Sequence, residues 1–222
     1  MTPRPRRYLF LALLCTCLFA VLATLVEAGA LNEIDSRLVV AVHQWAIDHP
    51  PVIRFFTFVT DLGAGWPLYW VGTLSAFALA WRREWFRSLV WLVGMLASRP
   101  VTPWFKGQFE RVRPPFVDWP DFSFPSGHAF GSAVTYGMLA LVILHVWRGS
   151  RWRWVLAGAV WAFIGLVMLS RPILGVHYPS DVLAGASLGF GWGFYWAAVA
   201  DWWDLRRLRG SAERVEQTQD PT

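Results

Sequence analysis

Three short segments combine cationic, histidine and acidic residues in a pattern that suits phosphate chemistry. They are residues 106–114, which contain Lys106, Arg113 and Pro114; residues 125–128, which read Pro125-Ser126-Gly127-His128; and residues 170–181, which contain Ser170, Arg171, His177 and Asp181. Arginine side chains bind phosphate oxygens in a bidentate manner, and a lysine adds a compact point charge. If the three segments meet in space, they form an anion-binding site with two histidines beside it.

The middle segment comes immediately before a long apolar run, so we expect Ser126 and Gly127 to lie at the start of a helix. The free backbone N–H groups and the positive dipole end of a helix N-terminus favour an anion. His128 and His177 can each transfer a proton or attack phosphorus, and the residues alone do not decide which does which. Asp181 follows His177 by four residues and is spaced to orient that imidazole.

Each of these residues has an ordinary structural explanation when it is taken alone. Cations near a membrane snorkel to headgroups, a serine before a helix is a cap, and a lone histidine is most often structural. Ionisable groups close to a bilayer are costly, however, and their combination on one face favours a functional site.

The elements that must position these residues are apolar helices. Of the 222 residues, 55% are hydrophobic and only 16% are charged, against about 25% charged in average soluble domains. A helix needs about 20 mostly apolar residues to cross a bilayer. Six stretches approach this length, namely residues 8–26, 66–81, 88–105, 126–147, 155–169 and 182–200. The sequence therefore predicts an all-α polytopic membrane protein built as a six-transmembrane-helix bundle.

Arginine clusters indicate how this bundle is oriented. They lie near residues 4–7, 82–87, 148–153 and 206–209, which are alternate connections between the six stretches. Because basic residues favour the cytoplasmic side, both termini are expected there and the three segments on the periplasmic or extracellular side. The formal net charge of +5 is thus a topology signal, and we expect no nucleic-acid partner.

The first connection, residues 27–62, is expected to contain an additional helix on the outer side. Asn32 and Asp35 resemble a helix start, and apolar residues follow at helical spacing as far as Trp45. This pattern predicts an amphipathic helix that lies in the membrane interface.

The domain organisation is simple. Residues 1–209 are expected to form one domain, and the polar residues 210–222 a disordered cytoplasmic tail. The first apolar stretch exceeds the length of a signal-peptide core, so we expect a retained span, although Ala28-Gly29-Ala30 resembles a cleavage site.

Two further arginines and a set of glycines carry weaker signals. Arg99 lies late in the third stretch and is expected to snorkel outward or to touch a lipid phosphate. Arg111 is expected to be a charge on the rim of the site. Four glycines of the last stretch are expected to permit close helix packing: Gly185, Gly189, Gly191 and Gly193.

Together the three segments resemble the signature of the type 2 phosphatidic acid phosphatase family. The matching motifs are Lys106-x6-Arg113-Pro114, Pro125-Ser126-Gly127-His128 and Ser170-Arg171-x5-His177-x3-Asp181. All eleven fixed positions agree in order and spacing, and the six-span layout extends the resemblance to about residues 8–200.

The resemblance implies a role for each residue. His177 is the implied nucleophile, which forms a phosphohistidine, Asp181 orients it, and His128 protonates the leaving oxygen. The implied phosphate-binding residues are Lys106, Arg113, Ser126, Gly127 and Arg171. Neither a metal nor another cofactor is implied.

The implied function is that of a lipid phosphatase in the bacterial inner (plasma) membrane, which acts on a lipid phosphate or diphosphate at the outer leaflet. Undecaprenyl pyrophosphate is the favoured substrate. The alternatives are a phosphatidylglycerophosphate or phosphatidic acid phosphatase, a lipid-to-lipid phosphotransferase and, outside enzymes, a lipid-binding or transport protein.

Overall fold

The computed structural model describes residues 4–219, with side chains described for residues 5–207, and within this range every regular element is a helix. The helices are α1 (Arg4–Glu27), α2 (Asn32–Ile47), α3 (Pro50–Leu62), α4 (Gly65–Trp81), α5 (Trp85–Ser98), α6 (Val101–Phe109), α7 (Gly127–Val146), α8 (Trp152–Ile173) and α9 (Pro179–Gln219). The all-helical fold class is confirmed.

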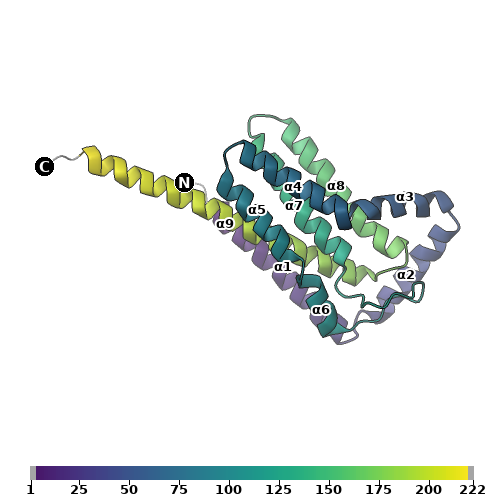
Figure 1. Ribbon diagram of the computed structural model, residues 1–222. Coiled ribbons are helices and arrows are strands. Elements are labelled where there is room, and N and C mark those ends of the chain that lie inside the picture. The colour runs from purple at the N-terminus through teal and green to yellow at the C-terminus, as the bar shows by residue number, and fades with distance from the viewer. Residues whose placement is uncertain (1–3, 220–222) are drawn as a thin grey trace.

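The bundle is organised around α7 and α9. α9 packs along both α1 and α7, α7 also packs against α8, and α4 contacts α5 and α7 (Figure 1). α2 and α3 project at the end of the bundle where α9 begins, and α6 lies at the same end (Figure 1). This end therefore gathers the connections that carry the candidate site residues.

Four of the described helices are long and apolar enough to cross a membrane. These candidate spans are Pro5–Glu27, Gly127–Val146, Trp152–Ile173 and Pro179–Arg207. α4 has 17 residues and α5 has 14, so both are shorter than the about 20 residues that cross a bilayer as a straight helix. The structure thus supports a multi-pass protein, and the count of six spans stays a prediction.

The expected third span over residues 88–105 is interrupted in the structure. α5 ends at Ser98 and a separate short helix, α6, begins at Val101. Pro100 lies at the break, and proline both lacks a backbone N–H and restricts the residue before it. The second stretch forms α4, which begins at Gly65 with a left-handed φ of 57° and is separate from α3, which ends at Leu62.

The expected helix after the first span and the expected disordered tail have different outcomes. The helix expected from Asn32 is present as α2, but its position relative to a membrane stays a prediction. α9 continues as a helix to Gln219, where the sequence favoured a disordered tail from residue 210. Its Ala, Glu, Arg and Gln residues are good helix formers, and extending an existing helix needs no new nucleus. Residues 220–222 of that tail lie outside the described residues.

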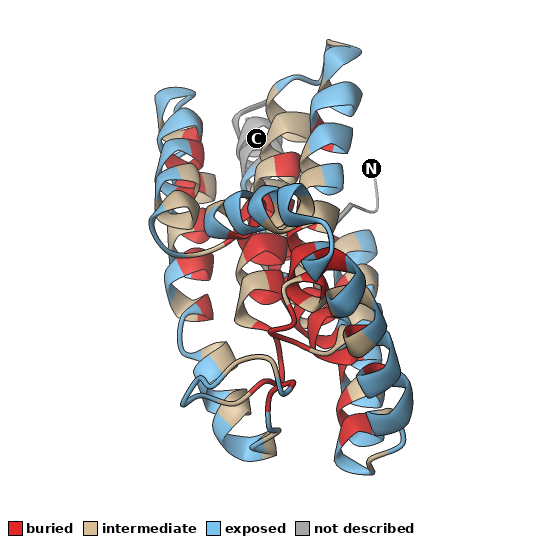
Figure 2. Cartoon of the chain, turned by 90° about the vertical axis from the view of Figure 1, so that its right-hand side faces the viewer, coloured by how far each residue is buried: buried red, intermediate tan, exposed pale blue. Residues whose placement is uncertain are grey.

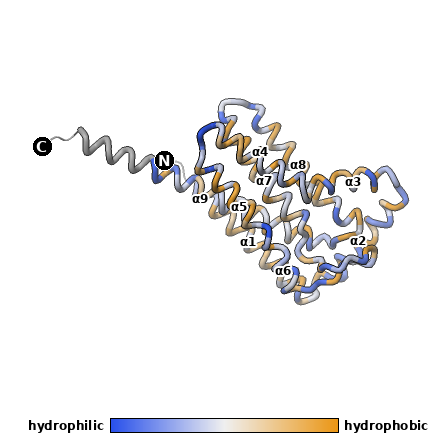
Figure 3. The backbone as a smooth tube through the Cα atoms, in the orientation of Figure 1, coloured by the Kyte–Doolittle hydropathy of each residue, from blue (hydrophilic) through white to orange (hydrophobic). Residues whose placement is uncertain are grey.

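The surface of the bundle suits a lipid environment. Buried residues gather on the helix faces that turn inward (Figure 2), whereas the outward face of α1 exposes large apolar side chains such as Leu9, Phe10, Leu13 and Leu14. The turns at the end of the bundle opposite to α6 are hydrophilic (Figure 3), and six arginines line neighbouring cavities there, namely Arg82, Arg83, Arg87, Arg148, Arg153 and Arg207. Arginines of three of the four expected clusters therefore gather at one end.

Glycines bring the starts of α7 and α9 into backbone contact, as expected. A Cβ atom on Gly185 would lie 2.4 Å from the carbonyl oxygen of Ser126, and one on Gly189 would lie 2.6 Å from that of Phe130. The Ser126 N–H also donates to the carbonyl of Asp181 at 3.0 Å. The start of α7 is thus joined to the start of α9 through backbone atoms.

We expect Gly185→Ala to destabilise the protein by about 1–3 kcal/mol, because the added methyl group meets a backbone oxygen that has no room to move. The matched control is Gly158→Ala on α8, where an added Cβ meets nothing within 4 Å and should stabilise the helix by about 0.5–1 kcal/mol. Thermal unfolding in detergent measures both. Equal stabilities of the two variants would contradict the packing argument.

Candidate active site

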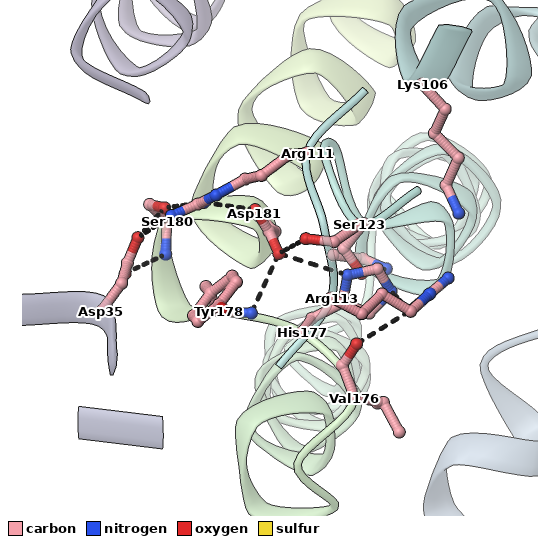
Figure 4. A network of polar contacts seen from close by, with 12 residues as sticks. Asp35, Lys106, Arg111, Arg113, Ser123, Val176, His177, Tyr178, Ser180 and Asp181 are labelled. Atoms are coloured by element: carbon pink, nitrogen blue, oxygen red, sulfur yellow. Dashed lines mark hydrogen bonds and ion pairs between the residues drawn. The ribbon is translucent and has the colours of Figure 1, made fainter. Parts of the chain in front are cut away.

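The structure brings the three sequence segments together. Lys106 lies in α6, Arg113 in the connection to α7, Arg171 in the last turn of α8, and Asp181 in the first turn of α9. His177 lies between α8 and α9, and Figure 4 shows its imidazole beside Arg113 and Asp181. His128, in the first turn of α7, is close enough to interact electrostatically with Arg171, His177, Arg113 and Lys106.

His177 is held in one defined orientation. Its side chain is 2% exposed, and Arg113 Nη1 donates to its Nε2 across 3.2 Å. Because a guanidinium is only a donor, Nε2 must be the unprotonated nitrogen, and the ring hydrogen is on Nδ1. Nδ1 faces Asp181 Oδ2 at 3.5 Å, a polar contact that is longer than a typical hydrogen bond.

The protonation state of His177 follows from its surroundings. Burial lowers the pKa of His177 to about 4, and the positive charges of Arg171 and Arg113 act in the same direction against the favourable effect of Asp181. At pH 7 the imidazole is therefore neutral. A neutral imidazole with its lone pair on Nε2 has the form that a nucleophile or a general base requires.

Asp181 is fixed by hydrogen bonds from three sides. Its side chain is fully buried, and Oδ2 accepts hydrogen bonds from Ser123 Oγ and from the backbone N–H of Tyr178 at 2.9 Å. Oδ1 accepts a bond from Arg111 Nη1 at 2.6 Å. These contacts hold the carboxylate facing His177 without any help from the imidazole.

Arg111 is part of the site's interior, so its expected role as a rim charge is wrong. Its side chain is 10% exposed and bridges Asp181 to Asp35 of α2, which lies 2.8 Å from Nη2. Asp35 in turn accepts a bond from the backbone N–H of Ser180 at 3.0 Å, and the Arg111 guanidinium lies 4.4 Å from the centre of the Tyr178 ring. α2 is therefore tied to the start of α9 by ionic contacts (Figure 4).

Arg171 is a buried cation with free donors. It is 2% exposed, and its Nη1 donates to Thr60 Oγ1 of α3. Within the described residues, its Nε and Nη2 have no hydrogen-bond partner. Buried donors of this kind are costly when unpaired, so these two groups are available to an anion, and the contact of Arg171 with a phosphate stays a prediction.

The other two cations are occupied by a carboxylate that the sequence did not single out. Asp121 accepts bonds from Lys106 Nζ and from Arg113 Nη2, which lies 2.8 Å from Oδ1 and 2.9 Å from Oδ2. Burial raises the pKa of Asp121, but the hydrogen bonds from Lys106 and Arg113 outweigh it, so the pKa ends below its usual value. Asp121 thus remains a carboxylate that competes with a phosphate for the same donors.

The start of α7 contributes a helix N-terminus. Ser126 is buried as the N-cap, and its Oγ accepts a long bond from the Ala129 N–H at 3.5 Å. Gly127 begins the helix, with its amide in the first turn. In the structure the Ser126 hydroxyl therefore caps α7, and its contact with a phosphate stays a prediction.

A cavity of about 140 Å³ reaches this helix start from between α4, α5 and α7. Its lining includes Gly127, Phe130, Leu68 and Arg99. Arg99 donates to the Tyr69 hydroxyl, and its guanidinium lies 4.6 Å from the centre of that ring. Arg99 is exposed and contacts α4 at the cavity, and its contact with a lipid phosphate or headgroup stays a prediction.

We expect Arg111→Gln to reduce kcat at least tenfold and to destabilise the protein by about 3–5 kcal/mol, because two buried carboxylates lose their shared cation. The control is Arg37→Gln on α2, whose ion pair with Glu33 is 79% exposed and should contribute little. Phosphate-release kinetics and thermal unfolding measure both variants. A normal kcat for Arg111→Gln would exclude this positioning role.

Asp121→Asn should tighten the binding of inorganic phosphate by about 3–10-fold, since the anion no longer displaces a carboxylate from Lys106 and Arg113. The matched control is Asp118→Asn, an exposed carboxylate in the same connection. The inhibition constant of inorganic phosphate reports the change. Weaker inhibition than in the unaltered protein would mean that Asp121 supports the cations and does not compete for them.

The comparisons with known proteins agree with this geometry. The PAP2 superfamily model matches residues 87–204. The chain is 31% identical over 182 residues to phosphatidylglycerophosphatase B of Bacillus subtilis, a match that covers 77% of this chain and 85% of that protein. It is also 39% identical over 84 residues to the undecaprenyl-diphosphatase of Sulfolobus acidocaldarius, which is 36% of each protein.

A solved structure is similar to this protein over almost the whole length of both chains. The crystal structure of a transmembrane PAP2-type phosphatidylglycerolphosphate phosphatase from Bacillus subtilis superposes with a TM-score of 0.76 at 26% identity, covering 92% of this chain and 98% of the other. The sequence signature, the arrangement of the site and these two levels of similarity agree, and the chain belongs to the PAP2 superfamily of lipid phosphatases.

Proposed function

We propose that this protein hydrolyses the phosphate ester or diphosphate of a membrane lipid through a phosphohistidine formed on His177. The observation that carries the proposal is the neutral, buried imidazole of His177, whose unprotonated Nε2 faces the guanidinium of Arg113. The unpaired donors of Arg171 and the fixed carboxylate of Asp181 support it.

In the proposed first step, Nε2 of His177 attacks phosphorus and the bond from phosphorus to the lipid oxygen breaks. His128 gives a proton to that oxygen, and Asp181 stabilises the positive charge that develops on the His177 ring. Lys106, Arg113 and Arg171 stabilise the negative charge on the phosphoryl oxygens. These cations perform the task that a metal ion has in other phosphatases, so the reaction should proceed with a chelator present.

In the second step, water attacks the phosphohistidine and His128 takes a proton from it. The P–N bond breaks, inorganic phosphate leaves, and His177 returns to its neutral form. His128 thus acts first as an acid and then as a base, which leaves its protonation state unchanged after each turnover.

We infer an orientation in which α4 and α5 complete six spans and the site faces the periplasmic or extracellular side of the inner membrane, with α2 in the outer interface. The support comes from the arginines of residues 82–87, 148–153 and 207, which gather at the opposite end of the bundle from α6. Basic residues favour the cytoplasmic side, so both termini would be cytoplasmic.

The lipid head group is the least constrained part of the proposal. Phosphatidylglycerophosphate is favoured because the curated relative that matches 77% of this chain and the solved structure that matches 92% of it both carry that name, although relatives named for other lipids match 70–71%. Undecaprenyl pyrophosphate, which the sequence favoured, stays a second candidate because the undecaprenyl-diphosphatase matches more closely over a shorter length. The cavity beside Gly127 opens among apolar side chains, where the chain of either lipid could lie.

We expect the purified protein to release phosphate from at least one of phosphatidylglycerophosphate, phosphatidic acid and undecaprenyl pyrophosphate in the presence of a chelator. His177→Ala should lower turnover by about 10³-fold or more, since it removes the nucleophile. The control is His49→Ala, because His49 is exposed and its side chain contacts Trp45, whose carbonyl it hydrogen-bonds one turn away.

Full turnover by His177→Ala would exclude the phosphohistidine. Labelled phosphate that moves to an added acceptor lipid would instead support the phosphotransferase. Lipid binding with no phosphate release from any substrate would support the binding or transport protein.

A further inference from the structure

Two neighbouring cavities lie at the end of the bundle opposite to the candidate active site. The first has a volume of about 320 Å³ and lies among α4, α5, α7 and α9, with apolar walls that include Leu79, Val90, Met138, Leu141, Val142 and Trp196. The second, of about 420 Å³, is lined mainly by charged side chains of the α4–α5 turn and the end of α7. Arg87, His145 and Arg148 line both cavities, so the apolar and the charged chambers adjoin.

The charged chamber has an excess of cations. Five arginines line it, namely Arg82, Arg83, Arg87, Arg148 and Arg207, against the two carboxylates Glu84 and Asp204. Arg87 is neutralised, because it pairs with Asp201 at 2.5 Å and with Asp204 at 2.6 Å. The remaining positive charge is therefore concentrated on the other arginines.

Arg148 lines both chambers, and Arg153 lines the apolar one. Arg148 contacts His145 Nδ1 at 2.6 Å, and Arg153 donates to the Arg148 carbonyl at 2.6 Å while lying over the Trp154 ring. Among the side chains that the structure describes, no carboxylate lies within ion-pair distance of either guanidinium. Both can therefore bind an external anion.

We propose that this end of the bundle is a binding site for an anionic phospholipid, separate from the catalytic site. The phosphate of the head group contacts Arg148 and Arg153, and one acyl chain enters the apolar chamber. An amphiphile is the occupant that matches both chambers, because a free inorganic anion would leave the apolar walls empty. Arg–phosphate contacts are strong when they are partly shielded from water.

Such a lipid would stabilise the contacts among several helices. The chamber is formed by side chains of α4, α5, α7 and α9 and by the start of α8. A ligand that binds only the folded arrangement raises its stability by mass action. The site therefore predicts a lipid-dependent stability that does not involve the residues of the catalytic centre.

General attraction of basic residues to anionic headgroups is the alternative explanation. Arg151 distinguishes the two, because it lies between Arg148 and Arg153 in the chain but lines neither chamber. General attraction predicts that all three arginines contribute alike to lipid binding. A specific site predicts that Arg148 and Arg153 contribute to lipid binding and that Arg151 does not.

The experiment measures thermal unfolding of the full-length protein in neutral detergent against increasing phosphatidylserine or phosphatidylcholine. Phosphatidylserine is anionic and is neither a substrate nor a product of the proposed reaction. We expect a saturable rise in Tm with phosphatidylserine alone. The Arg148→Gln/Arg153→Gln variant should need at least tenfold more lipid, which corresponds to about 1.4 kcal/mol, and Arg151→Gln should behave like the unaltered protein.

Phosphate release without added phosphatidylserine tests whether the double variant is folded, because neither arginine belongs to the catalytic centre. Normal release with a lost lipid response supports the site, and native mass spectrometry should then detect less bound phosphatidylserine. A loss in Arg151→Gln that is half as large as in the double variant or larger, or equal responses to the two lipids, would overturn the proposal. These outcomes do not depend on whether His177 is the nucleophile.

Discussion

The buried carboxylate of Asp181 is the group on which the rest of the site depends. It receives hydrogen bonds from Ser123, from the backbone of Tyr178 and from Arg111, and its own backbone carbonyl accepts the Ser126 N–H. Through these four contacts one residue joins the connection before α7, the start of α7 and the start of α9. An isolated carboxylate in such surroundings would be strongly unfavourable, so its partners are as necessary as the residue itself.

The backbone packing of α7 on α9 makes this arrangement possible. At Gly185 and Gly189, α9 approaches α7 so closely that any side chain would meet a carbonyl oxygen. This approach lets the Ser126 N–H reach the Asp181 carbonyl at 3.0 Å. Small residues have the same function in many membrane helix pairs, where close backbone approach replaces the hydrophobic driving force. The position of Asp181 in the site therefore depends on the close packing of α7 on α9.

The sequence predicted the parts of the site whose spacing is local. His177 and Asp181 are one helical turn apart, Ser126-Gly127 precedes an apolar run, and alternating connections returned the three segments to one side. Arg111 and Asp35 are 76 residues apart, and no local pattern marks such a pair. Asp121 was missed for the same reason, since it contacts Lys106 only through the fold. Pro100 itself signals a helix break, but the apolar residues on both sides of it suggested one continuous span.

The carboxylate of Asp121 also has a physical reason to lie where a phosphate should bind. Lys106 and Arg113 are mostly buried, with side chains 15% and 5% exposed, and both contact Asp121. The two positive charges repel each other, and an anion that contacts both offsets this repulsion. Asp121 supplies one negative charge and two acceptor oxygens, but the free donors of Arg171 remain unpaired. A phosphate brings more charge and more oxygens, so it can bind all three cations at once. In the proposed reaction, exchange of the carboxylate for phosphate would favour the substrate through the donors of Arg171, which Asp121 leaves free.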